Sequence, residues 1–102
     1  MDNMKNMGGM LKQLRDMQKE LVKAQKELAK RKLTVEAAGG AITLTVTGDQ
    51  KLDQIKISPE FLEANGAANL EKELTKAFNK ALEDSREMAQ ERLGPLSQGL
   101  NF

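Results

Sequence analysis

The stretch LTVEAAGGAITLTVT, residues 33–47, decides the fold because its apolar residues recur at every second position on both sides of a glycine pair. This period of two is typical of half-buried β-strands, and Gly39-Gly40 supplies a two-residue turn between them. A second turn at Gly48-Asp49 leads to a third strand, whose alternation is irregular at Leu52 and indicates a β-bulge. The sequence therefore predicts a three-stranded antiparallel meander over residues 33–57.

The residues before this sheet have the period of a helix. Their apolar positions are spaced alternately three and four apart, which is the heptad pattern of a helix that buries one seam against a partner. The seam consists of Met7, Met10, Leu14, Met17, Leu21, Ala24 and Leu28. Because Gly8-Gly9 weakens the beginning of this helix, we predict that the regular helix spans residues 10–31.

The residues after the sheet predict two more helices. Ser58-Pro59 supplies an N-cap and a proline at the first helical position, so a short helix begins there and ends at Asn65-Gly66. A long helix is expected over residues 68–93, ended by Gly94-Pro95. We therefore predict an α+β fold of the order αβββα, a single domain over residues 1–95, and a short flexible tail over residues 96–102.

Composition excludes most catalytic chemistry. The chain of 102 residues has no Cys and no His, so it lacks a thiolate nucleophile, an imidazole base and the usual zinc ligands. No Gly-rich phosphate loop is present, and we predict no catalytic residues, no metal and no cofactor. A metal enzyme using Asp49 and Asp53 is the weakest alternative, because acids in turns are usually solvated. No stretch is apolar enough for a signal peptide or a membrane span, so a cytoplasmic protein is expected.

The formal net charge of +1 hides an asymmetry. Residues 1–32 contain nine basic and four acidic groups, 9 − 4 = +5, so the rest of the chain carries −4. Basic residues of the first helix lie opposite its seam and predict a surface that follows phosphates, although a solvated helix face is the equally weighted alternative. These candidates are Lys12, Arg15, Lys19, Lys23, Lys26 and Lys30. Weaker candidates on the last helix are Lys76, Asn79 and Lys80.

Several segments together resemble the YbaB/EbfC family of bacterial nucleoid-associated proteins. The motifs are KNMG at residues 5–8, AGG at 38–40, ISP at 57–59 and AFNKA at 77–81. The resemblance implies a tweezer-like homodimer whose sheets form the body and whose long helices project and hold double-stranded DNA. It also implies a role in organising the nucleoid and modulating transcription.

A homodimer also supplies a partner for the helix seam and for the aliphatic face of the sheet. The expected interface residues are Met10, Leu14, Met17, Leu21, Ile42, Leu44 and Val46. The main alternative function is a non-enzymatic adaptor whose helices bind another protein, which remains unidentified, instead of DNA. Because five of the six basic candidates on the first helix are Lys and only Arg15 is an Arg, the expected DNA binding depends on phosphates more than on base sequence.

Overall fold

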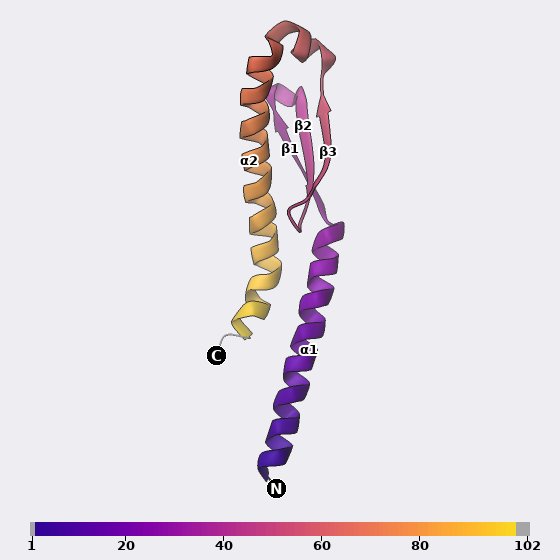
Figure 1. Ribbon diagram of the computed structural model, residues 1–102, viewed down its shortest axis with the longest axis vertical. Helices are drawn as coiled ribbons and strands as arrows, with labels where there is room; N and C mark the ends of the chain where they lie inside the picture. The colour runs from indigo at the N-terminus through magenta and orange to yellow at the C-terminus, as the bar shows by residue number, and fades with distance from the viewer. Residues whose placement is uncertain (1, 100–102) are drawn as a thin grey trace.

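The computed structural model describes residues 2–99, with side chains described for residues 8–96, and measures 76 × 21 × 16 Å. Figure 1 shows a long helix that leads into a three-stranded sheet, followed by a second long helix that runs back along the sheet. The elements are α1 (Asp2–Lys30), β1 (Lys32–Ala37), the 3-10 turn η1 (Ala38–Gly40), β2 (Ile42–Thr47), β3 (Leu52–Ile57) and α2 (Pro59–Gly99). The predicted α+β fold is confirmed. Met7 of the predicted seam has no described side chain.

The sheet is an antiparallel meander in the order β1-β2-β3. Its register places Val35 opposite Leu44 and Leu44 opposite Ile55, so these aliphatic side chains share one face. Thr45 faces Gln54 whereas Val46 faces Leu52, and the extra residue on β3 makes the bulge that the irregular alternation predicted.

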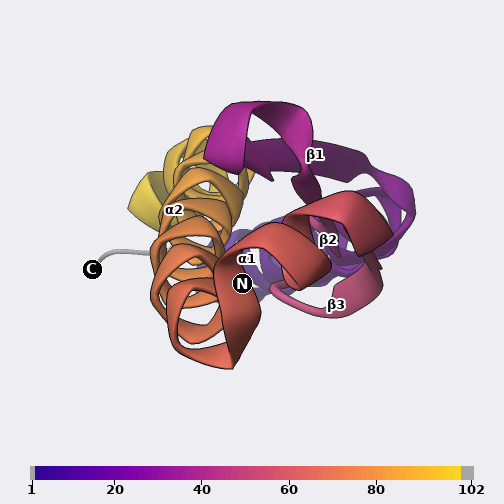
Figure 2. The same cartoon turned by 90° about the horizontal axis from the view of Figure 1, so that it is seen from above.

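The hydrophobic core lies between the aliphatic face of the sheet and α2. Small side chains on α2, Ala77 and Ala81, are buried against Val35, Leu44 and Val46 and allow the helix to approach closely. Viewed from above in Figure 2, α2 lies beside the sheet.

This packing corrects one part of the predicted dimer interface. The side chains of Ile42, Leu44 and Val46 are 0%, 0% and 1% exposed within a single chain, so they cannot meet a second copy. The alternation of β2 identifies its apolar face but not the element that covers it, and here that element is α2 of the same chain.

The helix ends also differ from the prediction. α1 begins at Asp2 rather than near residue 10, because Gly8-Gly9 is accommodated inside the helix at a modest cost in propensity. α2 contains the predicted break, since Gly66 has φ 74° and ψ 179°, values that separate a short first helix from the long second one. The long helix does not stop at Gly94-Pro95 but continues to Gly99.

Residues 96–99, which are predicted to belong to a flexible tail, continue the helix, while residues 100–102 lie outside the described residues. A proline removes one backbone donor, and this loss falls in the last turns of the helix, where few hydrogen bonds remain to be broken. The turn between β1 and β2 is also longer than the predicted two residues, with positive φ at Ala38, Gly39 and Gly40.

Candidate functional site

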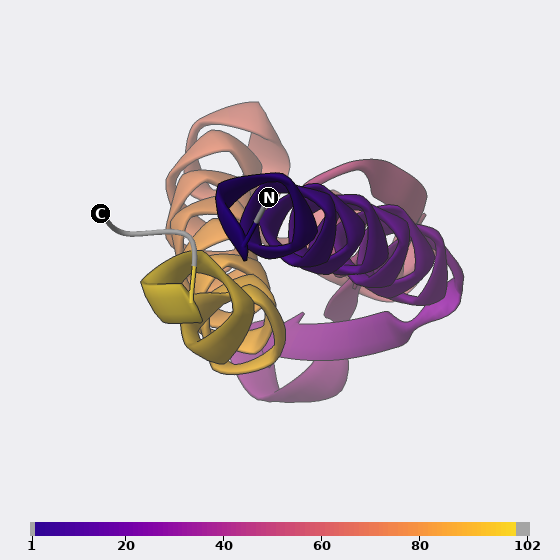
Figure 3. The same cartoon turned by 90° about the horizontal axis from the view of Figure 1, so that it is seen from below.

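Helix α1 projects from the body of the protein. Its 29 residues correspond to about 43 Å at 1.5 Å per residue. Its N-terminal end extends beyond the end of α2 in Figure 1 and lies nearest the viewer when the molecule is seen from below in Figure 3. Ala24 and Leu28, near its C-terminal end, are buried, whereas Met10 is 60% exposed. The helix is therefore anchored at one end and free on most of its surface.

The six basic candidates of this helix form one continuous surface, which we call the basic stripe. All six side chains are exposed, and steps of three and four residues bring them to one side of α1. They are Lys12, Arg15, Lys19, Lys23, Lys26 and Lys30. From residue 12 to residue 30 the stripe is about 27 Å long.

Two shallow grooves run along the stripe. The larger, of about 610 Å³, has Gln18 and Val22 among its lining residues together with all the stripe residues except Lys12. The smaller, of about 480 Å³, lies nearer the N-terminus and includes Lys12, Arg15 and Lys19 together with one acid, Asp16. The grooves place uncharged side chains beside cations, so a polyanion can lie against the helix with its charged groups at the edge.

The described carboxylates do not pair with the cations of the stripe. Glu27 also borders the larger groove, but its carboxylate accepts a hydrogen bond from Arg92 of α2. A row of like charges without internal partners creates a positive potential that attracts an anionic polymer.

The three weaker candidates on α2 have a different environment. Lys76 pairs with Glu73 at 3.8 Å, and Lys80 pairs with Asp84 at 2.8 Å. The hydrogen bond to Asp84 raises the pKa of Lys80 above its ordinary value, and the negative charge of Asp84 adds to the shift. The orange part of α2 that holds them flanks the sheet in Figure 1, away from the projecting end of α1. The structure does not bring them together with the basic stripe.

An exposed apolar surface lies where α2 meets β3. Leu52 and Ile55 of β3 and Phe78 of α2 are exposed and line a groove of about 270 Å³. We call this surface the β3–α2 patch. Asn79, one of the predicted DNA contacts, lines the same groove. β3 is also an edge strand, with only β2 as a neighbour among the described strands.

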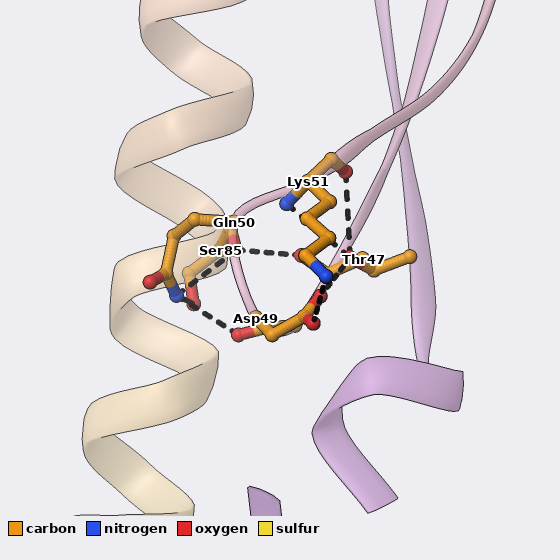
Figure 4. A network of polar contacts seen from close by, with 6 residues as sticks. Thr47, Asp49, Gln50, Lys51 and Ser85 are labelled. Atoms are coloured by element: carbon orange, nitrogen blue, oxygen red, sulfur yellow. Dashed lines mark hydrogen bonds and ion pairs between the residues drawn. The ribbon is translucent and has the colours of Figure 1, made fainter. Parts of the chain in front are cut away.

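The sequence patterns do not predict the residues that hold the turn between β2 and β3 against α2. Ser85 is fully buried and donates a hydrogen bond to the carbonyl oxygen of Thr47, 2.7 Å away. Figure 4 shows this contact within a network that also includes Asp49, Gln50 and Lys51. Serine as a residue type does not indicate burial. The one signal in the sequence is the position of Ser85 four residues after Ala81, on the same face of the helix.

The acids of the alternative metal site have other partners. Asp49 accepts a hydrogen bond from the Thr47 hydroxyl, and Asp53 pairs with Lys32 at 3.3 Å. Across the part of the chain that the structure describes, no three Asp or Glu side chains gather as a metal site would require. No described helix is both long and apolar enough to cross a membrane.

The meander backed by one helix, with a basic helix projecting from it, defines the class: a small α+β protein that presents a row of cations to solvent. Within that class, the sequence identifies one family. The chain belongs to the YbaB/EbfC DNA-binding family, whose sequence pattern matches residues 4–100.

Relatives over the full length agree with this assignment. A nucleoid-associated protein of Staphylococcus aureus strain JH9 is 42% identical over 95% of this chain and 92% of its own. A nucleoid-associated protein of Alkaliphilus metalliredigens is 33% identical over 100% of this chain and 90% of its own. The crystal structure of an uncharacterized protein from Helicobacter pylori shares the fold, with a TM-score of 0.72, 21% identity and coverage of 93% and 94% of the two chains.

Proposed function

We propose that this protein binds double-stranded DNA as a homodimer through the basic stripe of α1 and so coats or organises the nucleoid. The observation that carries the proposal is the row of six exposed cations, without carboxylate partners among the described residues, on a projecting helix. Family membership and the names of its relatives support DNA as the ligand. The proposal places the protein in the cytoplasm at the nucleoid and extends to modulation of transcription. It includes no catalytic step.

The proposed mechanism is electrostatic. Each Lys or Arg that meets a phosphate releases condensed counterions, so the logarithm of affinity falls by about 0.9 per phosphate for each unit of log salt. Lys presents a compact, mobile point charge, and Arg15 is the one residue of the stripe with the rigid guanidinium fork that matches a guanine edge. Binding is therefore expected to tolerate many sequences and to weaken steeply with salt.

A homodimer is proposed because the described residues leave two apolar surfaces without cover. The distal seam of α1 is one, with Met10 exposed and Leu14, Met17 and Leu21 half-buried. The β3–α2 patch at the open edge of the sheet is the other. A second copy, related by a two-fold axis, would cover both surfaces. The dimer would then present two basic stripes to one duplex, whose backbone is itself nearly two-fold symmetric.

The DNA proposal is tested by fluorescence anisotropy with a labelled random-sequence duplex at low and near-physiological salt. We expect salt-sensitive binding that is lost in the Lys19→Glu/Lys23→Glu variant. The matched control is Lys56→Glu/Lys72→Glu, which changes the net charge equally on exposed sites away from α1 and is expected to bind much more tightly than the stripe variant. No binding by the unmodified protein at low salt would contradict the proposal and favour the protein-binding adaptor.

The homodimer is tested by light scattering. The unmodified protein is expected at twice the 11.3 kDa of one chain. Leu52→Lys/Ile55→Lys, which places charges on the β3–α2 patch, is expected to shift the mass toward one chain. Gln54→Lys, an exposed residue between them in sequence, is the control and keeps the dimer. A single-chain mass for the unmodified protein would contradict the dimer.

A further inference from the structure

The turn between β2 and β3, residues 47–51, is held by both long helices; we call it the joint. On one side, the amide N–H of Gly48 donates to the carbonyl oxygens of Leu28 and Arg31, each 2.9 Å away. Leu28 lies in the last turn of α1 and Arg31 follows the helix, where carbonyl groups lack the usual helical donors. The Leu28 carbonyl also accepts a longer bond from the Arg31 amide, 3.2 Å away. The joint therefore caps the C-terminal end of α1, the helix that carries the basic stripe.

At Gly48 the turn lies close to both α1 and α2. A Cβ atom at this position would lie 2.8 Å from the Leu28 carbonyl oxygen, 2.9 Å from Leu28 Cδ2 and 3.1 Å from Met88 Sδ of α2. The first of these neighbours is backbone, which cannot rotate away as a side-chain end can. Only glycine fits without displacing α1 or the turn.

On the other side, the joint is tied to α2 by polar contacts. The buried Ser85 hydroxyl donates to the Thr47 carbonyl oxygen at 2.7 Å. The side-chain amide of Gln50 donates to the Gly48 carbonyl oxygen at 2.9 Å, and its nitrogen lies 3.4 Å from Ser85 Oγ (Figure 4). Gln50 adopts a positive φ of 61°, so its backbone is bent to make these contacts. The turn is thus a fixed connection between α2 and α1.

We infer that the joint sets the angle at which α1 leaves the body, and that Gly48 and Gln50 are positioning residues for DNA binding. This inference rests on the proposed function of the basic stripe. Within residues 8–30 of α1, the only buried side chains are Ala24 and Leu28, so packing holds the helix near one end. A rotation of about 10° at that end moves the other end of a helix of about 43 Å by about 7 Å.

A displacement of that size matters for binding to a regular polymer. Successive phosphates of one DNA strand advance about 3.4 Å along the axis, so about 7 Å corresponds to two steps. In a homodimer the two stripes must meet the same duplex, and a change of angle in each arm moves them relative to one another. The joint contributes no charge to the stripe. It affects DNA binding only through the direction in which α1 leaves the body.

The inference is tested by spin-label distances and by DNA affinity in the same proteins. The chain has no native cysteine, so labels can be placed uniquely at Gln13→Cys on α1 and Glu71→Cys on α2, both exposed and outside the stripe. Dilution with excess unlabelled protein restricts the measurement to distances within one chain. The test variants are Gly48→Ala and Gln50→Gly. The control is Gly9→Ala on α1, where an added Cβ meets no atom within 4 Å.

We expect Gly48→Ala to shift or broaden the distance by roughly 3 Å or more while α-helix content is kept. Its DNA affinity should fall about tenfold, as expected when one or two phosphate contacts are lost. Gln50→Gly keeps the positive φ but loses the amide contacts, so it should broaden the distribution and weaken binding in the same direction. It tests the inference even where Gly48→Ala does not fold. Gly9→Ala should match the unmodified protein in both measurements.

Two results would overturn the inference while leaving the proposed function intact. One is an unchanged distance distribution in folded Gly48→Ala and Gln50→Gly. The other is a changed distribution with DNA affinity equal to that of the unmodified protein. Failure of the proposed function is seen separately, as absence of DNA binding by the unmodified protein at low salt, and it would remove the DNA-positioning role whatever the distances show.

Discussion

Arg92 Nε lies 3.0 Å from Glu27 Oε2, and this ion pair links the C-terminal part of α2 to α1. Its side chains are 31% and 44% exposed, so water and salt screen the pair. We predict that Arg92→Ala lowers the free energy of unfolding by about 0.2–1 kcal/mol, and by less at high salt. Urea unfolding at two salt concentrations measures this. Arg86→Ala, which removes an exposed Arg of the same helix, should show no such salt dependence; an equal loss in both variants would contradict the prediction.

Leu44 of β2 is buried in the hydrophobic core between the sheet and α2. Leu44→Ala removes buried methyl groups and leaves a cavity, so we expect it to lower the free energy of unfolding by about 2–5 kcal/mol. Thr43→Val, on the opposite face of the same strand, is the control and should change it by no more than about 0.5 kcal/mol. Denaturant unfolding of both variants provides the comparison. A loss below about 1 kcal/mol in Leu44→Ala would show that α2 is not firmly packed on the sheet.

The beginning of α2 predicts a dependence on pH. The Ser58 hydroxyl donates to Glu60 Oε2 at 2.6 Å, and this bond holds the pKa of Glu60 below its ordinary value of 4.5. A lowered pKa in the folded state stabilises the protein above the ordinary pKa, and the contribution is lost as pH falls through the folded value. We expect Glu60→Gln to be less stable than the unmodified protein at pH 7. The difference should begin to shrink as pH falls below 4.5 and disappear once pH is below the lowered pKa of the folded state.

Ser58 itself is the N-cap of α2, because its oxygen accepts a hydrogen bond from the Phe61 amide at 3.4 Å. We expect Ser58→Ala to lower the free energy of unfolding by about 1 kcal/mol through loss of the cap. Unlike the Glu60→Gln effect, part of this loss should persist at low pH, since the amide donor remains unsatisfied there. A loss that vanishes completely below pH 4.5 would assign the whole effect to the carboxylate.

The salt dependence of DNA binding separates the stripe from the lysines of α2. Lys26→Gln is expected to reduce the slope of log affinity against log salt by about 0.9, because one phosphate contact is lost. Lys80 already has a partner in Asp84 at 2.8 Å, so Lys80→Gln should change the slope less. Titrations of one duplex at several salt concentrations give both slopes. Equal changes would place α2 on the DNA as firmly as α1.

Much of the architecture can be predicted from local patterns. Alternation in β2 and the turn at Gly48-Asp49 predict the meander, and the irregularity at Leu52 predicts its bulge. Helix ends are harder, because Gly8-Gly9 and Pro95 lower helix propensity without preventing helix formation when the surrounding residues favour it. The basic stripe could also be predicted, since its residues lie opposite a clear seam.

Contacts between distant segments could not be predicted from these patterns. An apolar face on β2 has the same alternation whether it meets α2 or a second copy, so the sequence does not identify α2 as the element that covers Leu44. The contact of Ser85 with Thr47 joins residues 38 positions apart, and neither residue type signals it. The exposed β3–α2 patch follows from where α2 lies on the sheet, which periodicity does not specify.

The dimensions of 76 × 21 × 16 Å have a consequence for hydrodynamics. A rod-like particle experiences more friction than a sphere of equal mass, so it diffuses and sediments more slowly. On a gel-filtration column calibrated with globular standards, even one chain of this shape elutes early and mimics a larger species. At a known oligomeric state, the frictional ratio from sedimentation velocity therefore reports on whether α1 stays extended, and a compact value would mean that the arm folds back onto the body.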